Sequence, residues 1–360
     1  MKKGLAIIIF FIMYQALVQA QGKLPLIKAD SALVDIRDGA TFKKRDWRIT
    51  PKARPDIYKT SSKNQKVTFY TDKDSISFYI EPGKKYDFVI LYNGKDSAYT
   101  EIQYVPGVLD ILKDGAKYAY SASGVHSSFP GAQAKAPELQ YIRTKFRLDS
   151  VAGHGDEISR FINVLHWVHN SIHHDGSKDA PASTGTGDLM NKCIQGNLPL
   201  NCGALADILE DCYSSLGYKA RRIICLPQDS TDFDCHSIDV VYSEKLKRWI
   251  WMDPTNDAYV MDENGELLGI AEVRDRLIND RPLKLNPDAN WNHINKVTSD
   301  YYLYYYMAKN LYALEFFYTE KGVNKSLLLT PSNYKGLIPR TRGNHPDCTH
   351  NPQIFWSVPE

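Results

Sequence analysis

Three residues in the second half of the chain are of the types needed for nucleophilic acyl transfer: the thiol of Cys202, the imidazole of His236 and the carboxylate of Asp253. In such chemistry a thiolate attacks a carbonyl carbon, and an imidazole moves the proton between nucleophile and leaving group. A carboxylate orients the imidazole and stabilises its charged form. Because these roles need fixed positions, the surrounding sequence has to form elements that bring the three groups together.

The segment after Asn201 and Cys202 predicts a helix that begins at the thiol. Its apolar residues recur at helical spacing, and Gly217 supplies a stop. The apolar residues are Leu205, Ile208, Leu209, Cys212 and Leu216. Unpaired backbone N–H groups and the helix dipole at a helix N-terminus lower the pKa of a thiol, as does a neighbouring imidazolium. Cys202 is therefore placed where a thiolate would form near neutral pH.

The other two groups are expected at the ends of two adjacent strands. Alternating apolar residues from His236 to Tyr242 predict a strand, residues 243–247 a turn, and residues 248–252 the returning strand. Asp253 then lies near the level of His236 on its antiparallel neighbour, within reach of the ring. The pattern predicts a Cys-His-Asp triad.

These residues also resemble the transglutaminase-like superfamily of papain-like thiol enzymes. The resemblance covers about residues 140–280, in the blocks Asn201–Leu209, Leu216–Ile224, His236–Val240 and Trp251–Thr255. It implies an α+β fold in which the helix carrying the nucleophile packs on an antiparallel sheet that supplies histidine and aspartate. Members include protein cross-linking enzymes, peptidases, amidases and inactive scaffolds. Many of them follow the histidine with a small residue and a Trp, where this chain has Ser237 and Ile238.

The first twenty residues predict a secretory signal peptide. Lys2 and Lys3 form a charged start, residues 5–13 an apolar run too short to span a bilayer with confidence, and residues 18–20 a small-residue cleavage site. Its removal takes the formal charge from +2 to 0, with no basic or acidic block elsewhere. This excludes nucleic acid and anionic membranes as expected partners. We therefore expect an exported bacterial monomer, periplasmic or secreted, that is not an integral membrane protein.

Two domains are expected after the signal peptide. Residues 24–105 contain short strands, turn signals and neither His nor Cys, which predicts a small all-β sandwich that positions substrate or covers the site. Residues 106–137 are expected to be a linker or loop, and residues 138–360 a transglutaminase-like catalytic domain with a C-terminal extension. Within the second domain we expect a strand over 141–148 and a helix-like segment over 308–317.

A metal site is the alternative to the thiol site. His166, His169 and His173 recur along one expected helix, but no acidic general base or distant third ligand accompanies them. The acidic segments 229–234 and 262–266 lack a complete calcium loop and are interpreted as turns. We expect neither a metal nor another cofactor.

The expected function is hydrolysis of an amide in a protein, a peptide or cell-wall-type material, through an acyl-enzyme on Cys202. Gln195 is a candidate oxyanion donor, because a side-chain amide can donate a hydrogen bond to a developing negative charge. Two alternatives stay open: a transglutaminase that transfers the acyl group to an amine, and a non-catalytic binding scaffold of the same fold. Among the remaining cysteines, Cys193 and Cys235 are expected to form a disulfide, and Cys212 and Cys225 to lie in the core.

Overall fold

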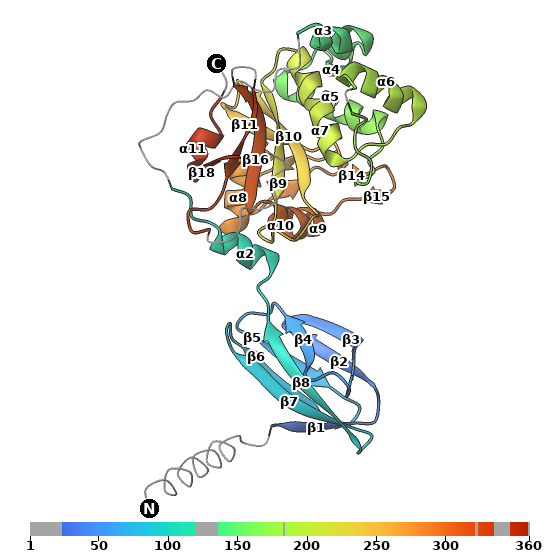
Figure 1. Ribbon diagram of the computed structural model, residues 1–360, viewed down its shortest axis with the longest axis vertical. Coiled ribbons are helices and arrows are strands. Elements are labelled where there is room, and N and C mark those ends of the chain that lie inside the picture. The colour runs from blue at the N-terminus through green and yellow to red at the C-terminus, as the bar shows by residue number, and fades with distance from the viewer. Residues whose placement is uncertain (1–23, 120–135, 183, 321–322, 335–345, 359–360) are drawn as a thin grey trace, which may run out of the picture. The chain divides into compact units, whose positions relative to one another are not determined.

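The computed structural model describes residues 24–119, 136–182, 184–320, 323–334 and 346–358 of a mixed α+β protein (Figure 1). The chain divides into two compact units, Met1–Gly107 (unit 1) and Val108–Glu360 (unit 2). The expected signal peptide lies outside the described residues. None of the helices in the described part of the chain is long and apolar enough to cross a membrane.

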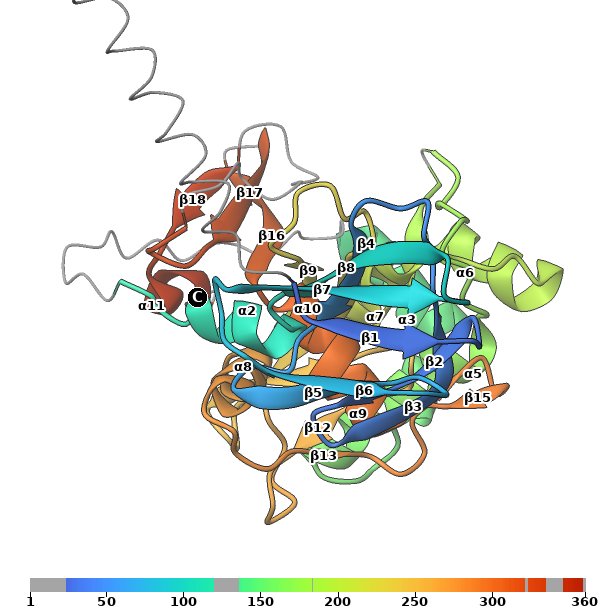
Figure 2. The same cartoon turned by 90° about the horizontal axis from the view of Figure 1, so that it is seen from below.

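Unit 1 consists of strands arranged in two four-stranded sheets, with the orders β1-β7-β8-β4 and β3-β2-β5-β6 (Figure 2). The strands are β1 (Leu26–Ala29), β2 (Leu33–Asp38), β3 (Thr41–Arg48), β4 (Asp56–Thr60), β5 (Gln65–Tyr70), β6 (Ser75–Ile80), β7 (Lys85–Tyr92) and β8 (Asp96–Tyr104). Alternate residues of both sheets meet in one core that includes Phe69 and Phe88. A turn at Asn93 and Gly94 joins β7 to β8, and both residues have positive φ, as this hairpin turn requires.

Unit 2 is built on a six-stranded sheet with the order β11-β10-β9-β16-β17-β18, antiparallel except for the β17–β18 pair. Its strands are β9 (Ala220–Leu226), β10 (His236–Ser243), β11 (Arg248–Met252), β12 (Val260–Met261), β13 (Lys284–Leu285), β14 (Asn290–Trp291), β15 (Asn295–Lys296), β16 (Ala313–Glu320), β17 (Val323–Leu329) and β18 (Asp347–Thr349). Its helices are α2 (Val108–Asp114), α3 (Ala136–Lys145), α4 (Leu148–Ala152), α5 (Glu157–Ser171), α6 (Thr186–Gly196), α7 (Cys202–Ser215), α8 (Ile270–Ile278), α9 (Ser299–Tyr301), the π-helix η1 (Tyr302–Met307), α10 (Ala308–Asn310) and α11 (Pro352–Phe355).

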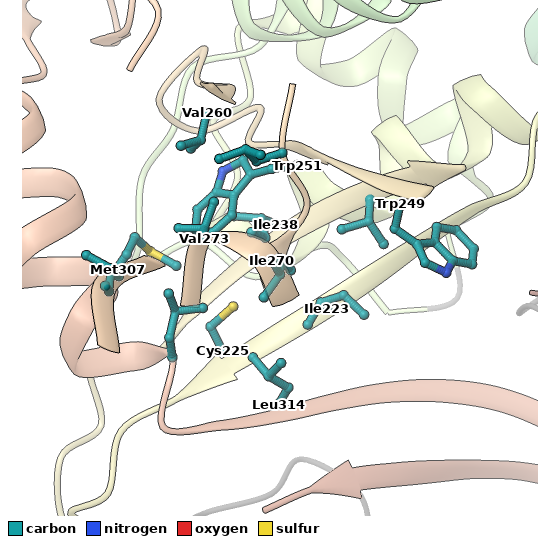
Figure 3. Close-up of a cluster of buried hydrophobic side chains, with 14 of the residues drawn as sticks. Ile223, Cys225, Ile238, Trp249, Trp251, Val260, Ile270, Val273, Met307 and Leu314 are labelled. Atoms are coloured by element: carbon teal, nitrogen blue, oxygen red, sulfur yellow. The ribbon is translucent and has the colours of Figure 1, made fainter. Parts of the chain in front are cut away.

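Helices cover both faces of this sheet, because its strands bury side chains on both sides. On one face Val241 and Ile250 pack against α3 to α7 in a core that also contains Cys212. On the other face Ile223 and Trp251 pack against α8, η1 and α10 (Figure 3). The strands at the β11 end of the sheet are thus held between two apolar layers, which fixes the positions of their ends.

Helix α7 begins and ends where the sequence predicts. The side chain of Asn201 caps it by accepting a hydrogen bond from the backbone N–H of Ala204 at 2.9 Å. Gly217 follows the helix with φ +87°, and the N–H of Tyr218 donates to the carbonyl of Tyr213, an arrangement that ends many helices. The helix packs on β9 and β10.

Two expected elements are wrong. Residues 141–148, expected as a strand, belong to α3 and the start of α4, and the N–H of Phe146 donates to the carbonyl of Ile142 four residues back, as in a helix. Of the helix-like segment expected over 308–317, only Ala308–Asn310 are helical (α10), and residues 313–317 belong to strand β16, which pairs with β9 and β17 on either side. Short apolar runs fit both periods, and the available sheet partners decide between them.

The expected linker over 106–137 contains a helix of unit 2. Leu112 of α2 is fully buried in the core that α8 and η1 share, and the Lys113 amine lies 2.7 Å from the carboxylate of Asp280. Gly115, just after α2, accepts a hydrogen bond from Arg274. Residues 120–135 lie outside the described part of the chain.

Candidate active site

The sulfur of Cys202 lies at the N-terminus of α7, where the cap residue Asn201 is itself fixed. The amide of Asn201 donates to a carboxylate oxygen of Asp179 at 2.6 Å, and its backbone N–H donates to the carbonyl of Lys178. The start of α7 is therefore held from three directions, counting the cap, and the thiol has a defined position.

His236 and Asp253 are joined by a hydrogen bond of 2.8 Å between Nε2 and Oδ2. Both side chains are buried, with exposed fractions of 3% and 0%. Residues 239 and 252 are partners in the β10–β11 ladder, so the start of one strand and the residue after the other lie close together. This is the geometry that the hairpin pattern predicts.

The carboxylate of Asp253 accepts hydrogen bonds from several neighbouring groups. Its carboxylate accepts from the backbone N–H of Thr255 at 2.8 Å, the amide of Asn256 at 2.9 Å and the hydroxyl of Tyr302 at 2.5 Å, besides His236. Burial alone would raise the pKa of Asp253, but the charge of His236 and these hydrogen bonds lower it below its usual range. The carboxylate thus stays ionised without contact with water.

The remaining ring nitrogen of His236 is available to Cys202, and the two side chains are hydrogen-bonded. Burial opposes a charged ring, but the charge and hydrogen bond of Asp253 and the contact with Cys202 raise the pKa of His236 to about 10. Burial likewise opposes a thiolate. Hydrogen bonds from His174 and His236, the charge of His236 and the backbone N–H of Ser237 lower the pKa of Cys202 to about 5. A thiolate–imidazolium pair is the stable state between these two values.

Two tyrosines of the aromatic segment Tyr301–Tyr306 contact this pair, a role that the sequence pattern did not reveal. Residues 302–307 form a π-helix, a form often found at functional sites. Tyr302 donates to Asp253, and the ring of Tyr306 packs edge-on against the ring of His236, with centroids 5.4 Å apart.

A second histidine contacts the thiol. The ring of His174, just beyond the end of α5, is hydrogen-bonded to Cys202, and its Nδ1 accepts a hydrogen bond of 3.0 Å from the indole of Trp291. Neither residue was expected at the site. No signal local to either sequence segment indicates the pair, because 117 residues separate its members.

Cys202, His236 and His174 open into a cavity of about 600 Å³. Its polar lining includes Asp179, Asn201, Asp234, Thr255, Asn256, Asn295, Lys296 and Thr298, and its aromatic lining includes Phe233, Trp291, Tyr301, Tyr302 and Tyr306. Phe233 and Tyr301 are 69% and 60% exposed, so aromatic surface faces solvent at this cavity. Cys202 is itself partly exposed, which makes this cavity the candidate substrate site.

Gln195 does not fit the expected role of oxyanion donor. It is exposed near the end of α6 and is not among the residues that line the cavity around Cys202. A donor in this role would have to face Cys202, whereas Gln195 belongs to α6, which continues through Gly196. Helix formation carries its amide to the surface.

The three histidines considered for a metal site do not converge, and His173 lies beyond the end of α5. Nδ1 of His166 lies 2.6 Å from Asp257, and His169 bonds the carbonyl of Pro254 and the amide oxygen of Asn290, whereas His173 is exposed. Among the described residues, no group of three or more His, Cys, Asp or Glu side chains could hold a metal ion. The histidines of α5 instead fasten the loop that follows Asp253.

Of the remaining cysteines, Cys212 and Cys225 are buried in the core, as predicted. The expected disulfide between Cys193 and Cys235 is wrong, because both are free thiols. Cys193 belongs to the core around α5 and α7, and Cys235 packs against a separate apolar cluster. Cys348 is exposed and also free.

Solved structures resemble this one only at low TM-scores. A protein from Cytophaga hutchinsonii described as a putative cysteine protease has a TM-score of 0.29 and 15% identity, over 56% of this chain and 67% of that one. Red sea bream transglutaminase has a TM-score of 0.25 and 9% identity, over 69% and 52%. A putative protease from Parabacteroides distasonis has a TM-score of 0.21 and 8% identity, over 48% and 37%, so this chain spans about half or less of the latter two.

No family model matches the sequence, and no curated protein matches it. The residues around Cys202 therefore carry the functional assignment.

Proposed function

We propose that this protein is a cysteine-dependent amide hydrolase that works through an acyl-enzyme on Cys202. The observation that supports this most is the set of contacts made by one imidazole. His236 is hydrogen-bonded to a thiol at a helix N-terminus, and its Nε2 lies 2.8 Å from the fully buried carboxylate of Asp253. Such an arrangement holds charge on both sulfur and ring at neutral pH, which is the active form of a thiol nucleophile.

Acylation uses the two charges of this pair. The thiolate of Cys202 attacks the carbonyl carbon of the amide, forming the S–C bond as the carbonyl electron pair moves to oxygen. When that pair returns, the C–N bond breaks and the imidazolium of His236 gives its proton to the leaving nitrogen. The products are a thioester and an amine, and His236 is left neutral.

Deacylation reverses the proton flow. Neutral His236 takes a proton from water, and the oxygen attacks the thioester carbon. Collapse of this second intermediate expels the Cys202 thiolate, releases the carboxylic acid and restores the imidazolium. Asp253 stabilises the imidazolium of His236 in both half-reactions without itself taking a proton.

Water is the proposed acceptor because it is abundant wherever the protein acts, whereas amines are scarce. The cavity faces solvent through Phe233 and Tyr301, which favours access by water. A transglutaminase would need an amine to outcompete water at the same thioester. The scaffold alternative is disfavoured by the donors gathered around Asp253, since a binding protein has no need for a buried ionised carboxylate next to a thiol-bound imidazole.

The proposed substrate is an amide in a protein, a peptide or cell-wall-type material. The proposed location is outside the cytoplasm, periplasmic or secreted, with the protein acting as a monomer. The support for export is the charged and apolar pattern of residues 1–20, and the net charge of 0 that remains after them argues against nucleic acid and anionic membranes as partners.

The test is to trap the acyl-enzyme with p-nitrophenyl acetate, a small ester that acylates active thiols. Stopped-flow absorbance measures the burst of p-nitrophenol, and peptide mass spectrometry locates the acetyl group. We expect a burst of about one equivalent with the acetyl group on Cys202. Cys202→Ala should lose the burst, and Cys348→Ala, which removes an exposed thiol, should keep it.

Adding putrescine to the acetylated enzyme separates water from amine as the acceptor. Release of acetate at an unchanged rate supports the hydrolase. Quantitative acetylputrescine at millimolar amine would favour the transglutaminase, and a burst that survives Cys202→Ala would remove the proposal altogether.

A further inference from the structure

His174 has the surroundings of a fixed functional group rather than of a loop residue. Its backbone N–H donates to the amide oxygen of Asn292 at 2.8 Å, and its carbonyl accepts from the amide of the same residue at 2.8 Å. The neighbouring backbone is paired with Leu200, two residues before Cys202. The backbone of His174 therefore has a fixed position relative to Cys202.

The partner of the His174 ring determines where its proton resides. Trp291 has only a donor, the indole N–H, and it points at Nδ1 at 3.0 Å. Nδ1 must then act as an acceptor, so a neutral His174 ring carries its proton on Nε2. Nε2 is the nitrogen left to contact Cys202, and the ring therefore presents an N–H donor to the sulfur.

The two histidines at Cys202 thus have opposite second partners. His236 is backed by the carboxylate of Asp253, which stabilises a charged ring and suits an acid and base. His174 is backed by an N–H group, so its Nδ1 acts as an acceptor. A ring held in this way donates a hydrogen bond without giving up its proton.

We propose that His174 is the side-chain oxyanion donor of this site, the role that the sequence suggests for Gln195. This inference depends on the proposed acyl transfer at Cys202. In the resting enzyme Nε2–H of His174 contacts the thiolate. As the S–C bond forms, negative charge leaves the sulfur and appears on the carbonyl oxygen, and the same N–H then donates to that oxygen.

No proton is transferred to or from His174 in this step. The carbonyl electron pair moves onto oxygen and returns when the leaving group departs, and the proton of the leaving amine comes from His236. A donor whose partner changes from sulfur to oxygen stabilises charge where it develops, and this kind of stabilisation lowers the barrier of acyl transfer.

The test compares two reactions of the same thiol in the full-length protein. Acetylation by p-nitrophenyl acetate forms an oxyanion, whereas alkylation by iodoacetamide displaces iodide and forms none. Both rates are measured at a pH at which Cys202 is fully ionised in each variant, as judged from the plateau of the alkylation profile. The variants are His174→Phe, His174→Gln and Trp291→Phe, with His173→Phe as the control because the side chain of His173 is exposed.

We expect His174→Phe to slow acetylation by about 10²–10³-fold relative to alkylation. His174→Gln, which keeps an N–H donor, should recover part of this loss, and His173→Phe should change neither rate. In ¹⁵N spectra of the histidine side chains, the wild type should show the Nε2–H form of His174, and Trp291→Phe should shift the signals toward a mixture of the two neutral forms. Unimpaired alkylation also shows that a variant is folded.

Equal slowing of both reactions in His174→Phe would overturn the inference, because His174 would then act only on the thiolate. An Nδ1–H form of His174 in the wild type would overturn it as well. If the wild type is alkylated at Cys202 but never acetylated there, the proposed function fails and this inference fails with it. Normal acetylation in both the wild type and His174→Phe would leave the function standing and remove only His174.

Discussion

Unit 1 and unit 2 each contain an aspartate whose side chain is almost fully buried and accepts several hydrogen bonds. These two aspartates differ in the cation that lies beside them. In unit 1 the side chain of Asp38 is 9% exposed and accepts from the hydroxyls of Thr60 at 2.6 Å and Tyr58 at 2.7 Å. In unit 2 Asp253 is 0% exposed and accepts from Tyr302 in the same way. The pKa of both carboxyls lies below its usual range, since hydrogen bonds and a neighbouring cation outweigh burial.

The cation decides what each carboxylate can do. Asp38 pairs with Lys43 at 3.3 Å, whose amine is partly exposed and has no nucleophile as a partner. Asp253 pairs with His236, a ring that can gain and lose its proton and that contacts a thiol. The same kind of donor network thus stabilises the fold in unit 1 and, under the proposed function, prepares an imidazole for catalysis in unit 2.

Removing the cation should give the largest difference between the units. His236→Ala should reduce acetylation of Cys202 to the level of Cys202→Ala. It should also destabilise unit 2 by about 3–5 kcal/mol, because it leaves the buried charge of Asp253 without its cation. Lys43→Ala should leave acetylation unchanged and cost about 0.2–1 kcal/mol, because water screens a partly exposed pair.

Stopped-flow acetylation and urea unfolding measure the two effects of these substitutions. The double variant His236→Ala with Asp253→Asn should be more stable than His236→Ala alone, since it removes the unpaired charge. Retention of the acetylation burst in His236→Ala would mean that another group activates the thiol.

Replacing each of the two aspartates by asparagine should change the acetylation rate by nearly as different an amount in the two units. Asp253→Asn should lower the acetylation rate by about 10³–10⁴-fold, because an amide neither stabilises the imidazolium nor accepts from all of its neighbours. Asp38→Asn is the matched control and should leave the rate unchanged. A comparable loss of rate in Asp38→Asn would show that the network of unit 1 contributes to the chemistry.

Removing one tyrosine hydroxyl in each unit should give a smaller difference in acetylation rate between the two units. Tyr302→Phe and Tyr58→Phe each delete one donor to a carboxylate, and each should cost about 1–3 kcal/mol in unfolding experiments. Only Tyr302→Phe should also slow acetylation, by about tenfold, which corresponds to about 1.4 kcal/mol of lost support for the charged pair. Equal rates for the two variants would exclude a role of Tyr302 in activating His236.

Deleting unit 1 should have the smallest effect on the thiol. A protein that begins at Val108 keeps α2, and its labelling by iodoacetamide should be within about twofold of that of the full chain, while turnover of large substrates falls if unit 1 supplies binding energy. A protein that begins at Pro137 would lose the buried Leu112 and should unfold more easily. A folded but unreactive protein beginning at Val108 would show that unit 1 completes the site.

The parts of the site that the sequence predicted are those encoded by local patterns. Cys202 is recognisable because an apolar helical period starts directly after it. His236 and Asp253 are recognisable because two short strands and a turn fix their relative level. Each inference needed only neighbouring residues, and the hydrogen bond between Nε2 and Oδ2 follows from the hairpin.

The supporting residues could not be predicted in this way. Tyr302 reaches Asp253 across 49 residues of sequence, and Trp291 reaches His174 across 117. Such pairs depend on how η1 and β14 pack against the rest of unit 2, which no local period records. Gln195 failed for the opposite reason: its position near Cys202 in sequence suggested a contact that the length of α6 prevents.

The central claim is that Cys202 is ionised at neutral pH because it is paired with His236. It is tested most directly by the pH dependence of iodoacetamide labelling, with Cys348 as the internal comparison. The pKa of Cys202 is lowered to about 5. Cys348 lies at the surface, where partial burial of its sulfur and the charges of Asp347 and Glu315 raise its pKa. The thiolate of Cys202 should therefore be present above pH 5 and lost as the pH falls through that value.

The labelling is followed by peptide mass spectrometry from about pH 4 to pH 9. The account predicts that Cys202 is labelled at a nearly constant rate above about pH 6, faster there than any other cysteine, and that the rate falls to half near pH 5. Labelling of Cys202 that increases only above about pH 8, or that lags behind Cys348 at pH 6, would contradict the thiolate–imidazolium pair and with it the proposed function.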